Sequence, residues 1–288
     1  MMIKTGLVLE GGGMRGLFSS GIIDVWMENG VQFDGIVGVS AGATFGCNYK
    51  SHQPGRVLRY NMRFRKDPKY MGLRSLIRTG DLVGASFSYH YLPTKLDIFD
   101  TDTFEKDHAE FHVVCTDVFT GEPVYRRIDR IDYNALEWMR ASASMPVVSR
   151  PVSIGGHVLL DGGISDSIPL RYFESEGFNR NIVILTQPKG YTKKRTKLMP
   201  FIKAAMNSKY PAIVEAMNRR HIMYNRELAY IEQQQAEGKC LVICPDDTLP
   251  ISRTSTNADK MQLVYDMGRQ KGLDYLQTVK EFIREANT

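Results

Sequence analysis

The chain has 288 residues, 43% hydrophobic and 24% charged, a globular composition large enough for one big α/β domain or two small ones. Its net charge of +5 is too small to indicate nucleic-acid binding, and no basic helix with interleaved aromatic residues is present. The N-terminus lacks the apolar core of a signal peptide, and no apolar run approaches about 18 residues. We therefore expect a cytoplasmic protein without a membrane-spanning helix.

The first fifty residues alternate between strand and helix patterns. Thr5–Glu10 reads as a buried strand, Leu17–Glu28 as a buried helix and Phe33–Val39 as a second strand. A helix of small residues starts directly after Ser40. This order predicts a parallel pair of strands joined by a crossover helix.

Strand and helix signals continue through the rest of the chain without an internal repeat or a linker. We expect short irregular helices over 56–90, two strands around a turn at 120–123, a helix over 133–144, a hairpin turning at 155–156, strands over 181–187 and 240–244, and long helices over 210–237 and 258–286. Gly268 and Gly272 are weak points of the last helix. The pattern predicts one α/β domain over 1–288, with a mainly parallel central sheet between helices and a helical C-terminal part over 198–288.

In the stretch GLVLEGGGMRG, residues 6–16, the first predicted strand is followed by three consecutive glycines, so the backbone there carries no side chains. Gly11, Gly13 and Gly16 satisfy the dinucleotide-binding pattern G-x-G-x-x-G, but that pattern also needs an acidic residue at the end of the second strand. Asp34 has nearly the right spacing and lies at the start of that strand instead. A phosphate-binding P-loop needs Gly-Lys-Ser/Thr, which residues 15–17 do not supply, so both phosphate-binding interpretations are weakened.

A serine motif follows the second strand. GVSAG, Gly38 to Gly42, matches G-x-S-x-G, in which a serine occupies a strained turn between a strand and a helix. The flanking glycines let the helix and the strand pack closely, and the turn exposes the hydroxyl of Ser40 at a helix N-terminus. The strand–turn–helix context makes Ser40 a candidate nucleophile.

The glycine loop gains a role beside such a serine. Parallel neighbouring strands end at one edge of a sheet, so the N–H groups of Gly11, Gly12 and Gly13 can face the carbonyl oxygen of an ester bound at Ser40. Oxyanion donors of this kind contribute about 3–4 kcal/mol to transition-state stabilisation. The alternative is a tight packing turn.

A serine nucleophile needs a proton acceptor. None of the six histidines lies in an evident loop motif after a strand. Asp161, in LLDGG, follows an apolar run and precedes two glycines. It is either the candidate base, a carboxylate at a strand end on a loop that can approach another backbone closely, or the start of an Asx turn. His157 lies on the same face of that segment but about 13 Å away along an extended strand, so the two cannot both reach Ser40.

The motifs GGGMRG, GVSAG and DGG, in this order, resemble those of the patatin-like phospholipase family. ASASMPVVSRPV, Ala141–Val152, and CTDVFTGEPVYR, Cys115–Arg126, also resemble segments of that family. The resemblance covers roughly Gly6 to Leu170, and the C-terminal third matches only loosely.

The resemblance implies a three-layer fold and a serine acyl hydrolase of lipid carboxyl esters, working by a Ser–Asp dyad and an acyl-enzyme. Ser40 is then the nucleophile and Asp161 the general base, with Gly11, Gly12 and Gly13 as the oxyanion hole. The remaining motif residues support this arrangement: Arg15, Gly16, Gly38, Gly42, Gly162 and Gly163. Arg15 matches a basic residue of the family's loop, where it shapes the hole or meets a phosphate. Asp166 stands where many members carry asparagine, so that position's hydrogen-bonding role does not carry over.

The dyad needs a carboxylate that is a stronger base than usual. A free aspartate has a pKa near 3.9, and partial burial against the apolar run 158–160 would raise it. No metal-ligand cluster and no cofactor motif is evident, so we expect calcium-independent chemistry without a cofactor. The four cysteines form no CxxC pair and read as buried thiols.

The segment 188–210 mixes lysines and arginines with apolar residues. It is interpreted either as a basic amphipathic rim that contacts an anionic membrane peripherally or as a solvated loop followed by an ordinary helix. Its basic residues are Lys189, Lys193, Lys194, Arg195, Lys197 and Lys203. Two other functions stay open: a nucleotide-binding protein that uses the glycine loop, and a non-catalytic lipid carrier. The sequence leaves the oligomeric state undetermined.

Overall fold

The computed structural model describes residues 3–285, and within them eight strands form one sheet in the order β5-β6-β3-β2-β1-β7-β8, with β4 paired to β3. The strands are β1 (Lys4–Leu9), β2 (Gly35–Val39), β3 (Glu110–Asp117), β4 (Pro123–Arg127), β5 (Val152–Ile154), β6 (His157–Asp161), β7 (Phe178–Ile184) and β8 (Cys240–Ile243). The pairs β1–β2, β2–β3, β1–β7 and β7–β8 are parallel, and β4, β5 and β6 pair antiparallel. The predicted α/β class with a mainly parallel sheet is confirmed.

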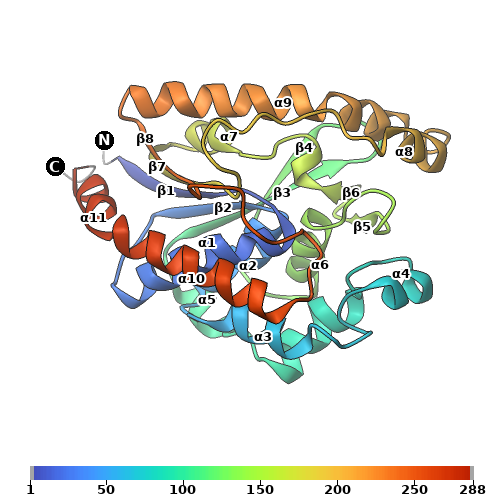
Figure 1. Cartoon of the computed structure of the whole chain (residues 1–288), viewed down its shortest axis with the longest axis horizontal. Helices are drawn as coiled ribbons and strands as arrows, with labels where there is room; N and C mark the ends of the chain where they lie inside the picture. Colours follow the sequence, from blue (N-terminus) through green and yellow to red (C-terminus); the bar gives the residue numbers. More distant parts are fainter. Residues whose placement is uncertain (1–2, 286–288) are drawn as a thin grey trace.

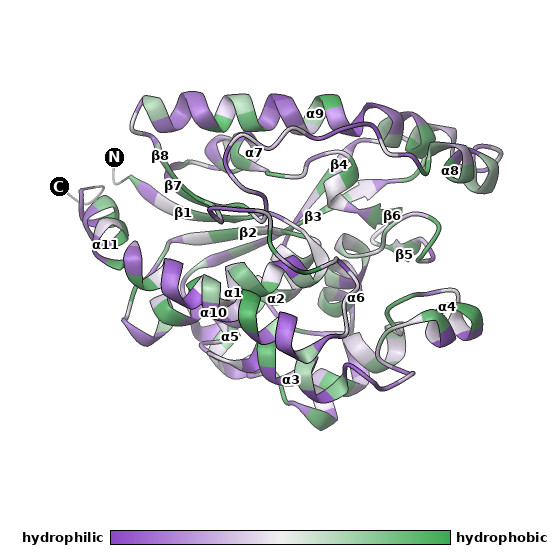
Figure 2. Cartoon of the chain, viewed as in Figure 1, coloured by the Kyte–Doolittle hydropathy of each residue, from purple (hydrophilic) through white to green (hydrophobic). Residues whose placement is uncertain are grey.

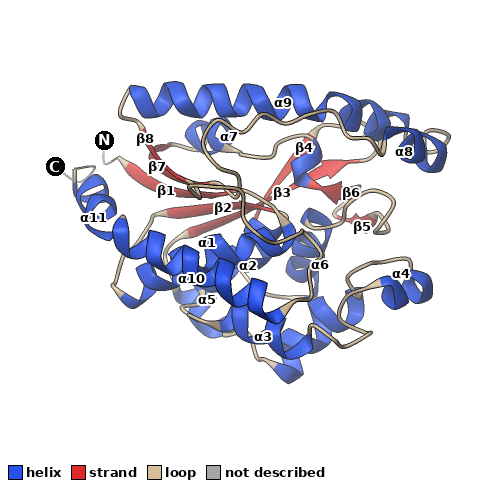
Figure 3. Ribbon diagram, in the orientation of Figure 1, coloured by secondary structure: helices blue, strands red, loops and turns tan. Residues whose placement is uncertain are grey.

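Helices cover both faces of the sheet, which gives three layers (Figures 1 and 3). One face carries α1 (Gly16–Glu28), α2 (Ala41–Lys50), α3 (Arg56–Phe64), α5 (Thr101–Lys106), α6 (Tyr133–Ser142) and α10 (Ala258–Asp274). The opposite face carries α7 (Leu170–Ser175), α8 (Met199–Met206) and α9 (Pro211–Ala236). The remaining helical segments are η1 (Gly13–Arg15), α4 (Leu73–Thr79), the π-helix η2 (Ser86–Leu96), η3 (Gly162–Ile164) and α11 (Leu276–Arg284).

The strands supply both core layers because successive side chains point to opposite faces. Leu7 and Leu9 of β1 belong to the core beneath α1 and α10, whereas Val8 between them belongs to the core beneath α7 and α9. Figure 2 shows the hydrophobic residues gathered in the strands between the two layers of helices. Strands buried on both faces are typical of parallel sheets, which explains their near-continuous apolar runs.

The C-terminal helix differs from its prediction. The region expected as one helix over 258–286 is α10 and α11, with a break at Tyr275, and residue 286 lies outside the described part. Gly268 and Gly272 are contact points rather than weak points: a Cβ on Gly268 would stand 2.0 Å from the carbonyl oxygen of Phe18 in α1. α10 therefore packs backbone against backbone on α1.

Short helices were the main omission of the sequence analysis. The sequence did not predict α5 or α7 as separate elements, although α5 has a recognisable start: the side chain of Asp100 accepts a hydrogen bond of 2.9 Å from the N–H of Thr103. Helices of six to eight residues cover fewer than three turns, too few for a clear apolar period.

Candidate active site

Ser40 occupies the turn between β2 and α2 with the backbone angles φ 56° and ψ −121°. A positive φ at a non-glycine residue is strained, and such strain concentrates at functional sites. The N–H of Ser40 donates to Ser142 Oγ at 2.9 Å, and that hydroxyl donates to the carbonyl oxygen of Val114 in β3 at 2.7 Å. The Ser40 hydroxyl lies beside the Asp161 carboxylate and lines the same cavity.

Gly38 and Gly42 permit this turn because the backbones approach too closely for a side chain. A Cβ on Gly38 would stand 2.4 Å from the carbonyl oxygen of Gly42, and a Cβ on Gly42 would stand 2.3 Å from that of Leu9. The G-x-S-x-G spacing thus has the structural cause that the sequence analysis gave it.

The glycine loop lies directly against Ser40. Leu9 pairs with Gly38 in the β1–β2 ladder, and a Cβ on Gly11 would stand 2.8 Å from the Cβ of Ser40. Among the residues that the structure describes, no hydrogen bond uses the N–H groups of Gly11, Gly12 or Gly13. The loop therefore offers unoccupied donors beside the hydroxyl.

A distant segment holds the end of this loop. Met14 N–H donates to the carbonyl oxygen of Arg253 at 3.0 Å, and Gly13 has a φ of 57°. A Cβ on Gly13 would stand 2.4 Å from that same oxygen. The loop after β8 thus fixes the conformation of the loop after β1.

Asp161 reaches Ser40 because β2 and β6 share one edge of β3. Cys115 of β3 pairs with both β4 and Asp161 of β6, so β4 and β6 lie on opposite edges. Val113 likewise pairs with both β4 and β2, so β2 is on the same edge as β6. Val39 ends β2 opposite Val114, one position from Cys115. The carboxyl ends of β2 and β6 therefore meet head to head.

The carboxylate of Asp161 is buried, with an exposed fraction of 2%. Its Oδ1 accepts a hydrogen bond of 2.8 Å from the N–H of Gly163, and its Oδ2 has no well-formed hydrogen bond in the described structure. Burial raises the pKa of Asp161, although the neighbouring Ser40 hydroxyl, the Arg220 guanidinium and the Gly163 N–H all favour its charged form. The group is a stronger base than a free aspartate and has one oxygen unoccupied.

The supporting motif residues lie around these groups. A Cβ on Gly162 would stand 2.2 Å from the carbonyl oxygen of Val114, and a Cβ on Gly16 would stand 3.0 Å from the ring of Phe45. Both glycines therefore allow close packing at the site. Arg15 lines the same cavity, and its Nε is buried without a hydrogen-bond partner among residues 3–285.

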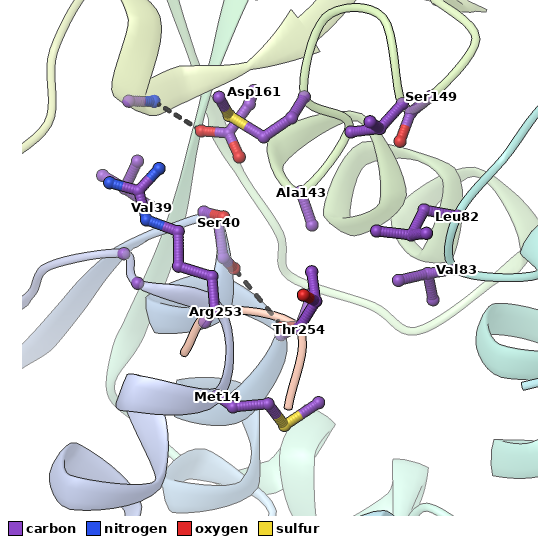
Figure 4. A pocket seen from close by; sticks show the side chains of 18 of the residues that line it. Met14, Val39, Ser40, Leu82, Val83, Ala143, Ser149, Asp161, Arg253 and Thr254 are labelled. Carbon is purple, nitrogen blue, oxygen red and sulfur yellow. Dashed lines mark hydrogen bonds between the residues drawn. The ribbon is translucent and has the colours of Figure 1, made fainter. Parts of the chain in front are cut away.

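Ser40 and Asp161 open into a cavity of about 920 Å³ (Figure 4). Its apolar wall includes Phe45 of α2, Leu92 of η2 and Met139 of α6. Its other wall carries charged groups that the sequence analysis did not predict in the site: Lys193, Arg220 and Arg253. Arg220 Nε donates to the carbonyl oxygen of Gly163, so it also holds the loop that contains Asp161.

Lys193 differs from both interpretations of the basic segment 188–210. It is neither a membrane-facing nor a solvated residue, since its exposed fraction is 8% and it lines the cavity. Burial, followed by the charge of Arg220, lowers the pKa of Lys193 to about 7. The neighbouring Lys194 and Arg195 are exposed, which hid the role of Lys193 in the sequence.

The histidines do not form a triad with Ser40. His157 pairs with Asp117 at 2.8 Å, His90 with Glu137 at 2.7 Å and His112 with Tyr172 at 2.7 Å. His221 of α9 lines the cavity, and its Nδ1 is buried without a partner in the described region. No hydrogen bond between His221 and Ser40 or Asp161 is formed in this part of the chain.

Two acidic residues have structural surroundings. Asp34 accepts hydrogen bonds from the N–H and hydroxyl of Thr5 at 2.7 and 2.8 Å, at the opposite ends of β1 and β2 from the glycine loop. It is thus unavailable to a nucleotide ribose at that loop. Asp166 accepts a hydrogen bond of 2.7 Å from the hydroxyl of Tyr125 and lies beside Glu227. Both carboxyls are buried, and this burial raises the pKa of each.

Of the four cysteines, Cys47 lines the cavity and the other three do not. The thiols of Cys47, Cys115 and Cys240 are free and buried, and that of Cys244 is free and partly exposed. Within residues 3–285, no cluster of His, Cys, Asp or Glu side chains could share a metal ion. No helix in this range has the length and hydropathy needed to cross a bilayer.

Comparison with known proteins gives two family matches. The family model described as Patatin-like phospholipase matches residues 7–174, and one described as Domain of unknown function (DUF6363) matches residues 210–284. The uncharacterized protein YjjU of Escherichia coli is 27% identical over 98% of this chain and 80% of its own length. Lysophospholipase nte1 of Aspergillus terreus is 24% identical over 96% of this chain but only 18% of its own length. Among solved structures, VipD from Legionella pneumophila aligns over 96% of this chain and 67% of its own, with 14% identity and a TM-score of 0.47.

Proposed function

The chain belongs to the patatin-like phospholipase family, whose members are lipid ester hydrolases, and we propose that it cleaves lipid carboxyl esters with a Ser40–Asp161 dyad. One observation carries the proposal. The carboxyl ends of β2 and β6 meet on β3, which brings a strained serine and a buried carboxylate together in a cavity with an apolar wall. The substrate class comprises phospholipids, lysophospholipids and neutral lipids.

The reaction proceeds in two steps through an acyl-enzyme. Ser40 Oγ attacks the ester carbonyl carbon while Asp161 Oδ2 accepts the hydroxyl proton, and the resulting oxyanion receives hydrogen bonds from the N–H groups of the glycine loop. The tetrahedral intermediate collapses, the carbon–oxygen bond of the ester breaks, and Asp161 returns the proton to the departing alcohol. Water then attacks the acyl carbon and gives a proton to Asp161. As the bond between the acyl carbon and Ser40 Oγ breaks, Asp161 passes that proton to Ser40 Oγ, which releases the fatty acid and restores the free enzyme.

The electrostatic surroundings of Asp161 support its role as base. A fully solvated carboxylate is too weak a base for a serine hydroxyl, because its pKa lies far below that of the hydroxyl. Burial raises the pKa of Asp161 and so narrows the difference between the two groups. The opposing cations Arg220 and Arg253 keep the ionised form accessible. The site thus holds a poorly solvated carboxylate whose ionised form is favoured by two nearby cations.

The test is labelling with a fluorophosphonate ester, followed by intact-mass measurement and peptide mapping. We expect one adduct on Ser40 in the wild type and none in Ser40→Ala. Ser142→Ala is a second comparison, because Ser142 is buried beside Ser40 and its loss should slow labelling without removing it. An adduct on another serine, or no adduct under conditions that label a control hydrolase, would contradict the proposed nucleophile.

We also propose a peripheral contact with anionic membranes at the cavity mouth. Leu198, directly before α8, and Phe201, within it, line the cavity and are 61% and 67% exposed. Leu73 and Ile77 of α4 are 68% and 78% exposed, and Figure 1 shows α4 and α8 at the same end of the molecule. Exposed apolar side chains beside Lys194, Arg195 and Lys197 are typical of surfaces that rest on acidic lipid.

Sedimentation with phosphatidylglycerol vesicles tests this contact. Phe201→Asp should reduce the bound fraction at low salt at least threefold. Leu263→Asp is the matched control, because Leu263 is a 50% exposed leucine of α10, away from α8. Equal binding by wild type and Phe201→Asp would refute the contact and leave the dyad unaffected.

A further inference from the structure

One wall of the cavity has more positive charge than its own carboxylates can balance. Arg15, Lys193, Arg220 and Arg253 all line it, and among residues 3–285 none of them forms an ion pair. Arg15 is partly buried, Lys193 is buried, and Arg253 is exposed at the edge of the cavity, where Figure 4 shows it beside Ser40. The wall is therefore electropositive from its depth to its opening.

The acidic residues of the cavity are already engaged. Glu10 Oε2 accepts from the N–H of Thr186 at 2.6 Å and from its hydroxyl at 3.1 Å, and Oε1 accepts from the hydroxyl of Tyr224 at 2.8 Å. Asp161 is the other carboxylate among the described lining residues. Of the other cations that line the cavity, Arg56 pairs with Asp97 at 3.1 Å and Lys194 is exposed to solvent. The two carboxylates thus face the four cations of this wall, and a bound anion can neutralise the excess charge.

Lys193 is held in position for such an anion. Its backbone N–H donates to Asn225 Oδ1 at 2.8 Å, and Asn225 Nδ2 donates back to its carbonyl oxygen at 3.0 Å. Its Nζ stands 3.8 Å from the centre of the Tyr224 ring, an arrangement that favours the cation. Burial without a carboxylate partner disfavours the charged form of Lys193, and a ligand of opposite charge would favour it again. A side chain held this firmly in the cavity wall therefore indicates such a ligand.

The second observation is the unpartnered Nε of Arg15, which is buried in the same wall. A guanidinium presents its donors in a planar fork that matches the oxygens of a phosphate. A phosphate monoester also carries more negative charge than a single carboxylate, so it is the better partner for several cations. The opposite wall, with Phe45, Leu92 and Met139, is apolar and suits an acyl chain. Ser40 lies between the two walls.

We propose that Arg15, Lys193 and Arg253 form a subsite for the phosphate of an anionic glycerolipid, placed so that the ester of the same molecule reaches Ser40. Arg220 instead positions the loop that contains Asp161. This inference rests on the proposed hydrolase function and narrows its substrate to phosphate-bearing lipids over neutral glycerides. Two of the three subsite residues lie outside residues 7–174, so the subsite is not part of the segment that carries the dyad.

The first experiment measures binding without catalysis. Ser40→Ala protein is titrated calorimetrically with glycerol 3-phosphate, glycerol and inorganic phosphate. We expect glycerol 3-phosphate to bind and glycerol not to bind. Lys193→Gln and Arg253→Gln should each weaken binding at least tenfold, while Lys280→Gln, which removes an exposed lysine of α11, should not change it. Inorganic phosphate that binds as tightly as glycerol 3-phosphate would assign the wall to free phosphate and overturn the head-group subsite.

The second experiment compares two substrates with one acyl chain, 1-oleoyl lysophosphatidate and 1-oleoylglycerol, in neutral detergent micelles. The wild type should prefer the phosphate-bearing ester at least tenfold in kcat/KM, and Lys193→Gln should reduce that ratio to near one, with partial rescue by Lys193→Arg. Equal turnover of both esters by the wild type would overturn the subsite while the hydrolase stands. If neither ester is cleaved, the proposed function fails, and the binding titration still decides the subsite.

Discussion

Residues 6–170 and residues 210–284 contribute to the candidate site in different ways. The first region supplies Ser40, Asp161 and the glycine loop, all at the carboxyl ends of strands of one sheet, so strand register determines their relative positions. The second supplies Arg220 from the middle of α9 and Arg253 from the loop after β8, whose long side chains reach into the cavity. The candidate reacting groups are thus positioned by hydrogen-bonded strands, whereas the positive charges come from long side chains that lie outside the sheet.

The two regions are nevertheless joined at the site itself. Met14 N–H donates to Arg253, Tyr224 donates to Glu10, and Arg220 donates to Gly163. Each of these hydrogen bonds connects a loop or strand end of the first region to α9 or to the loop after β8. We therefore propose that both regions belong to one domain, as the sequence predicted.

Asp161→Asn provides the strongest test of the first region, since it removes the base and retains the shape of the side chain. Turnover should fall by about 10⁴-fold, as it does when an essential member of such a catalytic unit is lost. The folded protein should survive, because Asp161 is buried at a cost: its raised pKa means that folding favours the neutral carboxyl.

Because its pKa is raised in the folded state, Asp161 makes the folding stability depend on pH. The favourable contribution of Asp161 to folding is complete below its usual pKa near 3.9 and is lost as the pH rises through the raised pKa of the folded state. Asn cannot ionise, so Asp161→Asn should unfold at a higher temperature than the wild type at pH 8, and the difference should shrink toward pH 4. Thermal unfolding at both pH values measures this, with the exposed Asp247→Asn as the control. Near-normal turnover by the folded variant would remove Asp161 from the mechanism.

The same contrast explains what the sequence could predict. Ser40 and its glycines were predictable because a strand, a serine and a helix occur within a few consecutive residues. Asp161 was identified through the family resemblance, since the head-to-head meeting of β2 and β6 depends on a register along β3 that no local pattern encodes. Lys193 was misread because its exposed neighbours suggested a surface segment, and Arg253 carries no local signal at all.

Gly268→Ala tests how tightly the second region is attached. Its new Cβ would meet the carbonyl oxygen of Phe18 at 2.0 Å, so α10 must move away from α1. Overpacking of this kind costs about 1–3 kcal/mol of unfolding free energy, and each kcal/mol lowers the Tm by about 2–4 °C in a chain of this size class. Gly272→Ala, whose Cβ would stand 3.0 Å from the Cα of Ile22, should cost less. A Tm that rises in Gly268→Ala would show that α10 packs more loosely than described.

Tyr224→Phe should have the smallest effect. It removes the 2.8 Å hydrogen bond from α9 to Glu10 and leaves the two from Thr186 in place, so we expect a loss of about 1 kcal/mol in a denaturant titration. Tyr210→Phe is the matched control, because its hydroxyl makes no hydrogen bond in the described structure, and it should change the midpoint very little. Equal effects of the two variants would mean that Glu10 does not depend on α9.

The hydrogen bond from Met14 to Arg253 also has a consequence for synthesis on the ribosome. Residue 14 leaves the exit tunnel early, but its partner emerges only after 239 further residues have been added. Until then the loop beside Ser40 lacks the contact that sets its shape, and the proposed nucleophile would lack a completed form of the proposed oxyanion hole. A protein that attacks lipid esters in this way would be inert toward the membranes around the ribosome until almost the whole chain had been translated.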